Sequence, residues 1–287
     1  MSPPHRPPVI EVRGLRTRFG PHVVHDGLDL DVRAGEILGI VGGSGTGKSV
    51  LLRTIAGLNT PAAGSVRVLG TDVFAADGAA RAALERQWGV MFQDGALFSS
   101  LTVRENVEVP MRGVPGLDRE ISRALAELKV SMVGLPPLAN SKYPSELSGG
   151  MRKRAGLARA LALDPRVVFL DEPTAGLDPI GAAEFDRLIR GLSRSLGLTV
   201  FLVTHDLDTL YAVCDRIAVL AEKRVLATGT LRDMLDVDHP WVQSYFKGPR
   251  ARAAQYGARE ADGGAGSDAG AARRRAAGGS GPARESD

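Results

Sequence analysis

The chain has 287 residues, of which 44% are hydrophobic and 24% charged, which is ample for a sizeable core in one large domain or two modest ones. A formal net charge of +3 gives no case for a nucleic-acid-binding protein, and no apolar run approaches the roughly 20 residues needed to span a bilayer. The start of the chain lacks the apolar stretch of a secretory signal, and Cys214 is the only cysteine, so we expect a protein of the reducing cytoplasm without an intrachain disulfide.

Short alternating segments come first along the chain. Residues 1–8 are rich in proline and are expected to be flexible. After them, alternating apolar and polar residues separated by glycine-containing turns predict strands of an antiparallel sheet. These strands are residues 9–15, 28–32 and 64–70.

Buried strands and amphipathic helices then alternate. Short apolar runs predict buried strands in EILGIVG, GVMFQ, RVVFLDEPT and TVFLVTHD. Apolar residues three and four positions apart predict helices that contain Leu51, Leu52 and Ile55, then Ile121, Leu125, Leu128 and Met132, then Phe185, Leu188, Ile189, Leu192 and Leu196. Residues 216–229 predict a hairpin. This alternation predicts an α/β fold in which helices cover both faces of a parallel sheet.

Two different segments follow the hairpin. Residues 236–248 form an aromatic extension, in which Trp241, Tyr245 and Phe246 either pack on the core or reach a partner subunit. Beyond Gly248 the sequence has no Leu, Ile, Val, Phe, Met or Trp. Residues 249–287 are therefore expected to be a disordered, solvated tail rather than a segment that contacts an anionic membrane.

A glycine-rich loop lies between a predicted strand and a predicted helix. It fits the phosphate-loop pattern G-x-x-x-x-G-K-[ST]. Its glycines let backbone N–H groups turn inward as an anion nest, and the start of the helix adds partial positive charge. In such a loop Lys48 reaches the β- and γ-phosphates, and the Ser49 hydroxyl ligates Mg²⁺. The predicted nucleotide-binding residues are Gly42, Gly43, Ser44, Gly45, Thr46, Gly47, Lys48 and Ser49.

Two acids follow a later buried strand. Asp171 lies at the carboxyl end of that strand, where open α/β sheets bind ligands, and is predicted to hold Mg²⁺. Glu172, one residue on, points elsewhere and is predicted to polarise the attacking water. Alone, such a pair is a solvent-facing strand end; beside a phosphate loop, it indicates hydrolysis of a nucleotide phosphate.

Motifs in a fixed order resemble those of the ATPase subunits of ABC transporters over about residues 9–246. They are GGSGTGKS, Gln93 in MFQDG, LSGGM, VVFLDE, AGLD and His205 in VTHD. The resemblance implies an α/β P-loop NTPase at residues 9–235, with a RecA-like core, an antiparallel β subdomain and an α-helical subdomain inserted at about 94–160. It also implies ATPase activity, with ATP and Mg²⁺ as cofactors.

The resemblance further implies roles for single residues. Phe19 in TRFG matches the aromatic residue that stacks on adenine, with a core phenylalanine as the alternative. Gln93 matches the residue that contacts Mg²⁺ and the attacking water and joins the core to the helical subdomain. His205 matches the residue that contacts the γ-phosphate. Together with Lys48 and Glu172, these two are the expected catalytic residues.

In this family two subunits sandwich two ATP molecules head to tail. The resemblance implies that Ser148, Gly149 and Gly150 start a helix whose amides face the γ-phosphate held by the other subunit. It implies likewise that Asp178 crosses the dimer interface. A homodimer of ATPase subunits is therefore expected.

Longer stretches resemble the ATPases of bacterial Mla/Mce-type phospholipid transport systems, which serve outer-membrane lipid asymmetry. Met151 after LSGG is typical of that group, where glutamine is usual elsewhere, although no physical argument derives a lipid from it. The group implies a place on the cytoplasmic face of the bacterial inner membrane. It implies a membrane permease, an MCE-domain lipid-binding subunit and a STAS-domain subunit as partners, and no nucleic acid. Residues 95–103 are expected to contact the permease.

Other readings remain open. An importer of another solute, such as an amino acid or a metal, shares all the ATPase motifs. A soluble ABC protein that acts on ribosomes or DNA is disfavoured, because the chain has one cassette and no sustained heptads between Ser49 and Leu147. An inactive regulatory subunit is disfavoured by the intact Lys48, Glu172 and His205.

Overall fold

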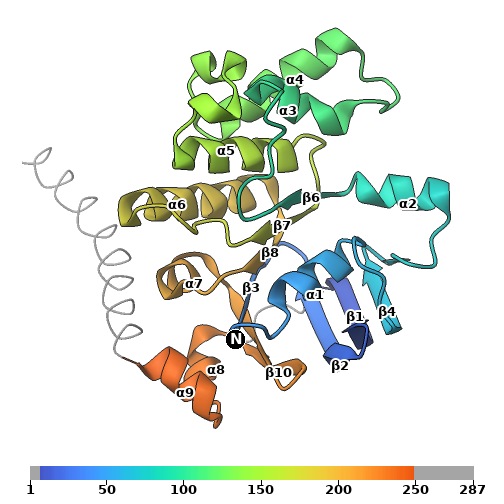
Figure 1. Ribbon diagram of the computed structural model, residues 1–287, viewed down its shortest axis with the longest axis vertical. Coiled ribbons are helices and arrows are strands. Elements are labelled where there is room, and N and C mark those ends of the chain that lie inside the picture. The colour runs from blue at the N-terminus through green and yellow to red at the C-terminus, as the bar shows by residue number, and fades with distance from the viewer. Residues whose placement is uncertain (1–6, 249–287) are drawn as a thin grey trace, which may run out of the picture.

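Two sheets and a layer of helices make up residues 7–248, the part of the chain that the computed structural model describes (Figure 1). The predicted tail, residues 249–287, and residues 1–6 of the predicted flexible N-terminus lie outside the described residues. Pro8, the last residue of the predicted flexible segment, instead lies in the first strand and pairs with Arg33 of the second strand. No helix in the described range has the length and apolar character needed to cross a bilayer.

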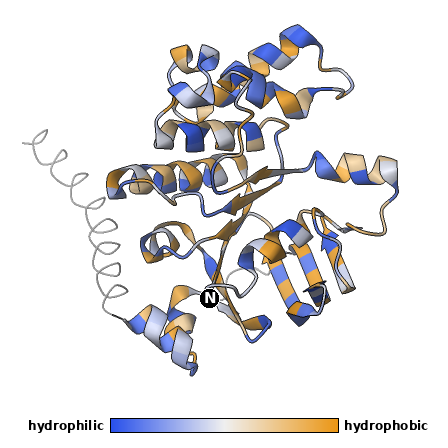
Figure 2. Ribbon diagram, viewed as in Figure 1, coloured by the Kyte–Doolittle hydropathy of each residue, from blue (hydrophilic) through white to orange (hydrophobic). Residues whose placement is uncertain are grey.

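The smaller sheet is antiparallel and lies at the lower right of Figure 1. Its strands pair in the order β2-β1-β4-β5 and are β1 (Pro8–Phe19), β2 (His22–Arg33), β4 (Ala63–Val68) and β5 (Thr71–Asp72). Apolar and polar residues alternate along β1 and β2 because one face packs on the core and the other faces solvent (Figure 2). The antiparallel strands predicted from alternation are confirmed.

The larger sheet carries the buried strands. Its order is β10-β9-β3-β8-β7-β6, made of β3 (Ile37–Gly42), β6 (Trp88–Met91), β7 (Val167–Asp171), β8 (Thr199–Val203), β9 (Arg216–Ala221) and β10 (Arg224–Gly229). Neighbouring strands are parallel, except that β9 and β10 form the predicted antiparallel hairpin. Every residue of β3, β7 and β8 is buried, as the continuous apolar runs predict.

Helices cover the larger sheet and extend beyond it. They are α1 (Lys48–Ile55), α2 (Gly78–Glu85), α3 (Val103–Glu108), α4 (Arg119–Met132), α5 (Gly149–Ala160), α6 (Pro179–Leu196), α7 (Leu207–Val213), α8 (Leu231–Leu235) and α9 (Pro240–Lys247), with 3-10 turns η1 (Val109–Met111), η2 (Pro137–Ser141) and η3 (Pro144–Glu146). The predicted helices correspond to α1, α4 and α6. Helices α3, α4 and α5 form a layer at the top of Figure 1, away from the smaller sheet.

The buried strands divide their side chains between two cores. Val168 and Leu170 of β7 pack in a cluster with residues of α3 to α6. Val167 and Phe169, which alternate with them, pack in a second cluster with α1 and the smaller sheet. Because both faces of the sheet are covered, the sequence of β7 is a continuous apolar run and not an alternation of apolar and polar residues. The arrangement confirms the predicted α/β fold, with an antiparallel sheet on one side and a helical layer on the other.

The buried face of α4 differs from the predicted one. Ile121 and Leu128 are 43% and 52% exposed, whereas Ala126, Lys129 and Val130 are buried. The spacing predicted the helix correctly but misplaced the centre of its buried face, although Leu125 packs partly buried against the core. Small and β-branched side chains permit close packing against α3 and α5, and the buried lysine is tolerated because a carboxylate pairs with its ammonium.

The aromatic extension packs on its own chain, which was the first of the two alternatives. Val242 and Phe246 of α9 are buried in a third cluster with residues of α7, α8 and β9. Trp241 stacks on Tyr245 with ring centroids 4.7 Å apart. These contacts hold α9 against the same end of the larger sheet at which the predicted site residues lie.

Candidate functional site

The phosphate loop joins β3 to α1. Gly45 and Gly47 have φ of 76° and 92°, a backbone region that glycine adopts without a steric cost. A Cβ on Gly47 would lie 2.4 Å from Val24 Cγ1 and 2.6 Å from His25 Nε2, so only glycine fits there. No side chain caps the start of α1. Its first amides are therefore available to an anion.

Lys48 opens α1 and turns back over the loop. Its Nζ donates to the carbonyl oxygens of Gly42 at 2.9 Å and Gly43 at 3.0 Å. Burial lowers the pKa of Lys48, and the charges of Glu172 and Asp171 partly oppose that shift. The ammonium thus lies between the loop and the two acids, where it can neutralise phosphate charge.

Ser49 and Asp171 bring two oxygen ligands together. Ser49 Oγ donates to Asp171 Oδ1 at 2.9 Å, which joins the first turn of α1 to the end of β7. Hydroxyl and carboxylate oxygens suit Mg²⁺, which commonly takes its other positions from water and substrate phosphates. Within residues 7–248 no group of three or more His, Cys, Asp or Glu side chains is placed to hold a metal ion. The donor set therefore fits a Mg²⁺ ion whose shell a nucleotide completes.

Glu172 is held in a strained conformation beside His205. Its φ of 50° lies in the left-handed region, which costs a non-glycine residue about 1 kcal/mol or more. The Glu172 amide donates to the Val203 carbonyl at 2.9 Å, and Oε2 lies 2.8 Å from His205 Nδ1. The Glu172 side chain is 15% exposed and that of His205 is 71% exposed. This geometry suits a base and the group that orients it.

The remaining predicted residues lie on other segments. Gln93 follows β6, and its backbone oxygen accepts a hydrogen bond from Lys153. Ser148 caps α5 by accepting from the Met151 amide at 3.2 Å, and Asp178 caps α6 by accepting from the next amides of that helix. Figure 1 shows α5 in the helical layer, apart from α1. The structure therefore does not bring Ser148, Gly149 and Gly150 to the phosphate loop of the same chain.

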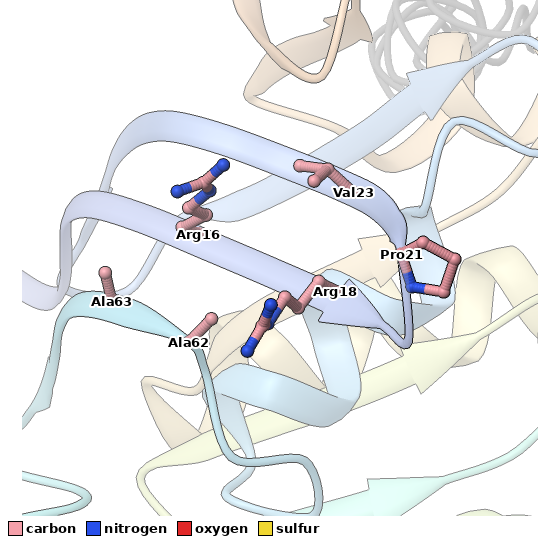
Figure 3. Close-up of a pocket in the computed structure, with 6 residues that line it drawn as sticks. All are labelled: Arg16, Arg18, Pro21, Val23, Ala62 and Ala63. Atoms are coloured by element: carbon pink, nitrogen blue, oxygen red, sulfur yellow. The ribbon is translucent and has the colours of Figure 1, made fainter.

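Phe19 ends β1 with 54% of its surface exposed, which excludes the alternative of a core phenylalanine. Two residues earlier, Thr17 Oγ1 lies 2.8 Å from Nδ1 of His25, which borders the phosphate loop. The exposed ring is thus available to stack on a base. Arg16 and Arg18 instead line a cavity of about 420 Å³ on the sheet's solvent side, which includes no residue of the loop (Figure 3).

Sequence reasoning missed two contacts beside these residues. Lys153 of α5 is 6% exposed and donates to the backbone oxygens of Gln93 and Glu172. Tyr245 of α9 donates its O–H to the His205 carbonyl at 2.9 Å. The other buried residues of α5 are Ala, Gly and Leu. In the sequence, however, Lys153 stands between Arg152 and Arg154 and gave no signal of burial, and the sequence offered none for the tyrosine either.

Known proteins resemble this chain in sequence. The family model described as ABC transporter matches residues 25–175. The methionine import ATP-binding protein MetN of Caulobacter vibrioides is 43% identical, over 85% of this chain and 70% of its own. The probable ribonucleotide transport ATP-binding protein mkl of Mycobacterium leprae is 38% identical, over 84% of this chain and 69% of its own. The intermembrane phospholipid transport system ATP-binding protein MlaF of Haemophilus influenzae is 37% identical, over 84% of this chain and 90% of its own.

A solved structure extends the comparison to three dimensions. It is a dimeric post-hydrolysis state of an ATP-binding cassette bound to ADP and Pi. It superposes with a TM-score of 0.70 and 30% sequence identity, covering 78% of this chain and 99% of that chain. The described fold is therefore that of a P-loop ATP-binding cassette.

Proposed function

We propose that this chain, which belongs to the ABC transporter family as an ATP-binding and ATP-hydrolysing subunit, energises phospholipid transport through a separate membrane permease. The observation that carries the hydrolytic role is the pair of contacts beside the phosphate loop. Ser49 lies 2.9 Å from Asp171, and Glu172 lies 2.8 Å from His205. A metal-holding pair and a water-activating pair are thus placed side by side by consecutive residues of one strand end.

The predicted site residues have separate roles in phosphoryl transfer. Lys48 and the amides of residues 42–49 bind the β- and γ-phosphates, and Phe19 stacks on the adenine. Ser49 and Asp171 hold Mg²⁺, with Gln93 as a further ligand. When bound, this ion neutralises charge on the β- and γ-phosphate oxygens.

Glu172 acts on the water that attacks the γ-phosphorus. Its carboxylate accepts a proton from that water as the bond from phosphorus to the bridging β-oxygen breaks, which yields ADP and phosphate. His205 orients the carboxylate and contacts the γ-phosphate from its exposed position. The backbone of Glu172 is strained, which fits a residue whose carboxylate must point in one direction even at a cost in local stability.

A second copy of the chain completes each site. Ser148 caps α5, and Gly149 and Gly150 are the first residues of that helix. We assign the amides of this helix start to the nucleotide held by the partner. Asp178, at the start of α6, is assigned to the same interface. The active form is then a homodimer with two ATP molecules between the subunits.

The phospholipid substrate is supported by the sequence resemblance to the MlaF relative, which is 37% identical over 84% of this chain. Met151, which follows LSGG, packs partly buried against the core of the helical layer. The partners proposed on this basis are a permease that contacts residues 95–103, an MCE-domain lipid-binding subunit and a STAS-domain subunit. The assembly would lie on the cytoplasmic face of the inner membrane, without nucleic acid.

Import of an amino acid is the second candidate, because the MetN relative is the more similar in sequence at 43% identity. Co-purification from membranes separates the two. An MCE-domain protein retained with the tagged chain supports phospholipid transport, whereas a periplasmic amino-acid-binding protein supports import and contradicts the phospholipid assignment.

The hydrolytic role is tested by replacing the base. Glu172→Gln keeps the size of the side chain but removes the proton acceptor, so we expect kcat for ATP hydrolysis to fall by about a hundredfold or more, with ATP binding retained. Phosphate release by the purified wild type and variant measures this. An inactive wild type, or a Glu172→Gln variant with undiminished kcat, would contradict the assignment.

A further inference from the structure

A lysine side chain lies inside the protein at the point where three segments of the site meet. Lys153, in the second turn of α5, is 6% exposed. Its ammonium donates to the backbone oxygen of Glu172 at 3.1 Å and also to the backbone oxygen of Gln93. One side chain therefore ties α5 both to Gln93, two residues after β6, and to Glu172, the residue after β7.

The acceptors distinguish this lysine from the other buried one. Lys129 of α4 is 3% exposed and forms an ion pair with Asp164. Lys153 instead meets two carbonyl groups, and burial lowers its pKa although Asp94, Glu172 and Asp171 oppose the shift. Burying an ammonium whose hydrogen-bond acceptors are only carbonyl groups is costly. A lysine at this position is therefore not expected to stabilise the fold more than an apolar residue of the same length.

The contact falls on a residue whose backbone needs support. Glu172 has its left-handed φ of 50°, with its amide fixed by Val203 on one side. On the other side its carbonyl accepts from both Lys153 and the Ala175 amide, the latter at 3.2 Å. The direction of the carboxylate toward His205 follows from that backbone, so the ammonium acts on the carboxylate through the main chain.

A row of α5 residues extends the link along the loop that follows β6. Arg159 donates to the carbonyl oxygens of Gly95 at 2.8 Å and Ala96 at 2.6 Å. A Cβ on Gly156 would lie 3.0 Å from the Gly95 Cα, so helix and loop are in close backbone contact there. With Lys153, these residues recur every three positions and therefore share one face of α5. The helix and the loop are bound to move together.

We propose that Lys153 is a positioning residue that couples α5 to hydrolysis by fixing the main chain of Gln93 and Glu172 together. The start of the same helix carries Ser148 to Gly150. Engagement of that start by a second subunit's nucleotide is thereby transmitted through one ammonium to the hydrolytic residues of the first subunit. The inference rests on the roles proposed above for Gln93 and Glu172.

The test compares Lys153→Met with Lys129→Met in the full-length chain. Methionine keeps the length and apolar stem of lysine and removes the donors. For Lys153→Met we expect kcat for ATP hydrolysis to fall by about tenfold or more while KM changes by less than about twofold, because phosphate binding at Lys48 is untouched. For Lys129→Met we expect a lower Tm with kcat per folded molecule unchanged. Lys153→Arg, which keeps charge and donors, should recover part of the lost kcat.

Each outcome decides between a positioning and a structural role. Equal kcat in wild type and folded Lys153→Met overturns the proposal, as does an equal loss of kcat in Lys129→Met. Should Lys153→Met not fold, Lys153→Gln and Lys153→Arg decide, since the shorter amide cannot reach both carbonyls and must give the lower kcat of the two. An inactive wild type would overturn the hydrolytic function instead, which separates the two failures.

Discussion

At the scale of single residues, His25 shows how the phosphate loop constrains a side chain outside it. The residue is fully buried, with Nδ1 2.8 Å from Thr17 Oγ1 and Nε2 at the place where a side chain on Gly47 would lie. Burial lowers the pKa of His25 from 6.5 to about 4, and the backbone of Gly47 and Thr46 only partly opposes this. A neutral imidazole thus fills the space under the loop.

The lowered pKa of His25 predicts a loss of stability in weak acid. In the unfolded chain the histidine takes up a proton near pH 6.5, whereas in the folded chain it does so near pH 4. Its contribution to the free energy of unfolding is therefore fully present above the unfolded value and is lost as the pH falls from 6.5 toward 4. Between pH 7 and pH 5 the loss is about 2 kcal/mol.

Denaturant unfolding at both pH values, for the wild type and for His25→Leu, measures this contribution. Leucine keeps the site apolar and filled but cannot titrate, so the variant should lose less stability between pH 7 and pH 5 than the wild type. The difference between the two pH dependences isolates His25 from the many carboxylates that also titrate. The same pH dependence in both proteins would show that folding does not lower the pKa of His25.

At the scale of elements, α4 gives a direct test of which helix face is buried. Val130 is 1% exposed and Leu128 is 52% exposed. Val130→Ala should lower the free energy of unfolding by about 1.5 kcal/mol, because it removes buried methyl groups and leaves a cavity, whereas Leu128→Ala should change it by less than about 0.5 kcal/mol. Denaturant unfolding of the purified chain checks both values. The reverse order is what the apolar stripe in the sequence would have predicted.

The same comparison shows what the sequence can and cannot predict. Buried strands and the phosphate loop were predictable because their patterns are local, and Ser49 and Asp171 were predictable partners because each stands at the end of such a pattern. The face of α4 was not, because the burial of Val130 rather than Leu128 depends on how α4 packs against α3 and α5. Lys153 was missed for a related reason, since backbone oxygens that accept from a lysine leave no mark in the sequence.

At the scale of the whole molecule, the predicted site residues fall into two groups. At the carboxyl ends of strands of the larger sheet, Ser49 contacts Asp171 and Glu172 contacts His205, and the charges of both acids act on Lys48. The start of α5 lies apart from them in the helical layer (Figure 1). In the function proposed above, the first group binds the nucleotide of its own chain, and the start of α5 serves the nucleotide held by a second copy.

The last prediction concerns Gly149, a position at which the described structure gives no steric reason for glycine. A Cβ at this position would meet nothing within 4 Å and its φ is not in the left-handed region, in contrast to Gly47. Gly149→Val should therefore leave Tm within about 2 °C of the wild type and leave ATP binding intact, while the side chain blocks approach of a partner's γ-phosphate. We expect ATP hydrolysis to be lost, together with the ATP-dependent dimer that Glu172→Gln should accumulate in size-exclusion chromatography.

Gly191→Val in α6 is the matched control, because a Cβ there also meets nothing within 4 Å. It should dimerise in the Glu172→Gln background and, in the wild-type background, hydrolyse ATP at the normal rate. If Gly149→Val also dimerises and hydrolyses normally, α5 does not serve a neighbouring nucleotide. If it binds ATP but does neither, the requirement for glycine lies between molecules, since no neighbour within 4 Å among residues 7–248 demands it.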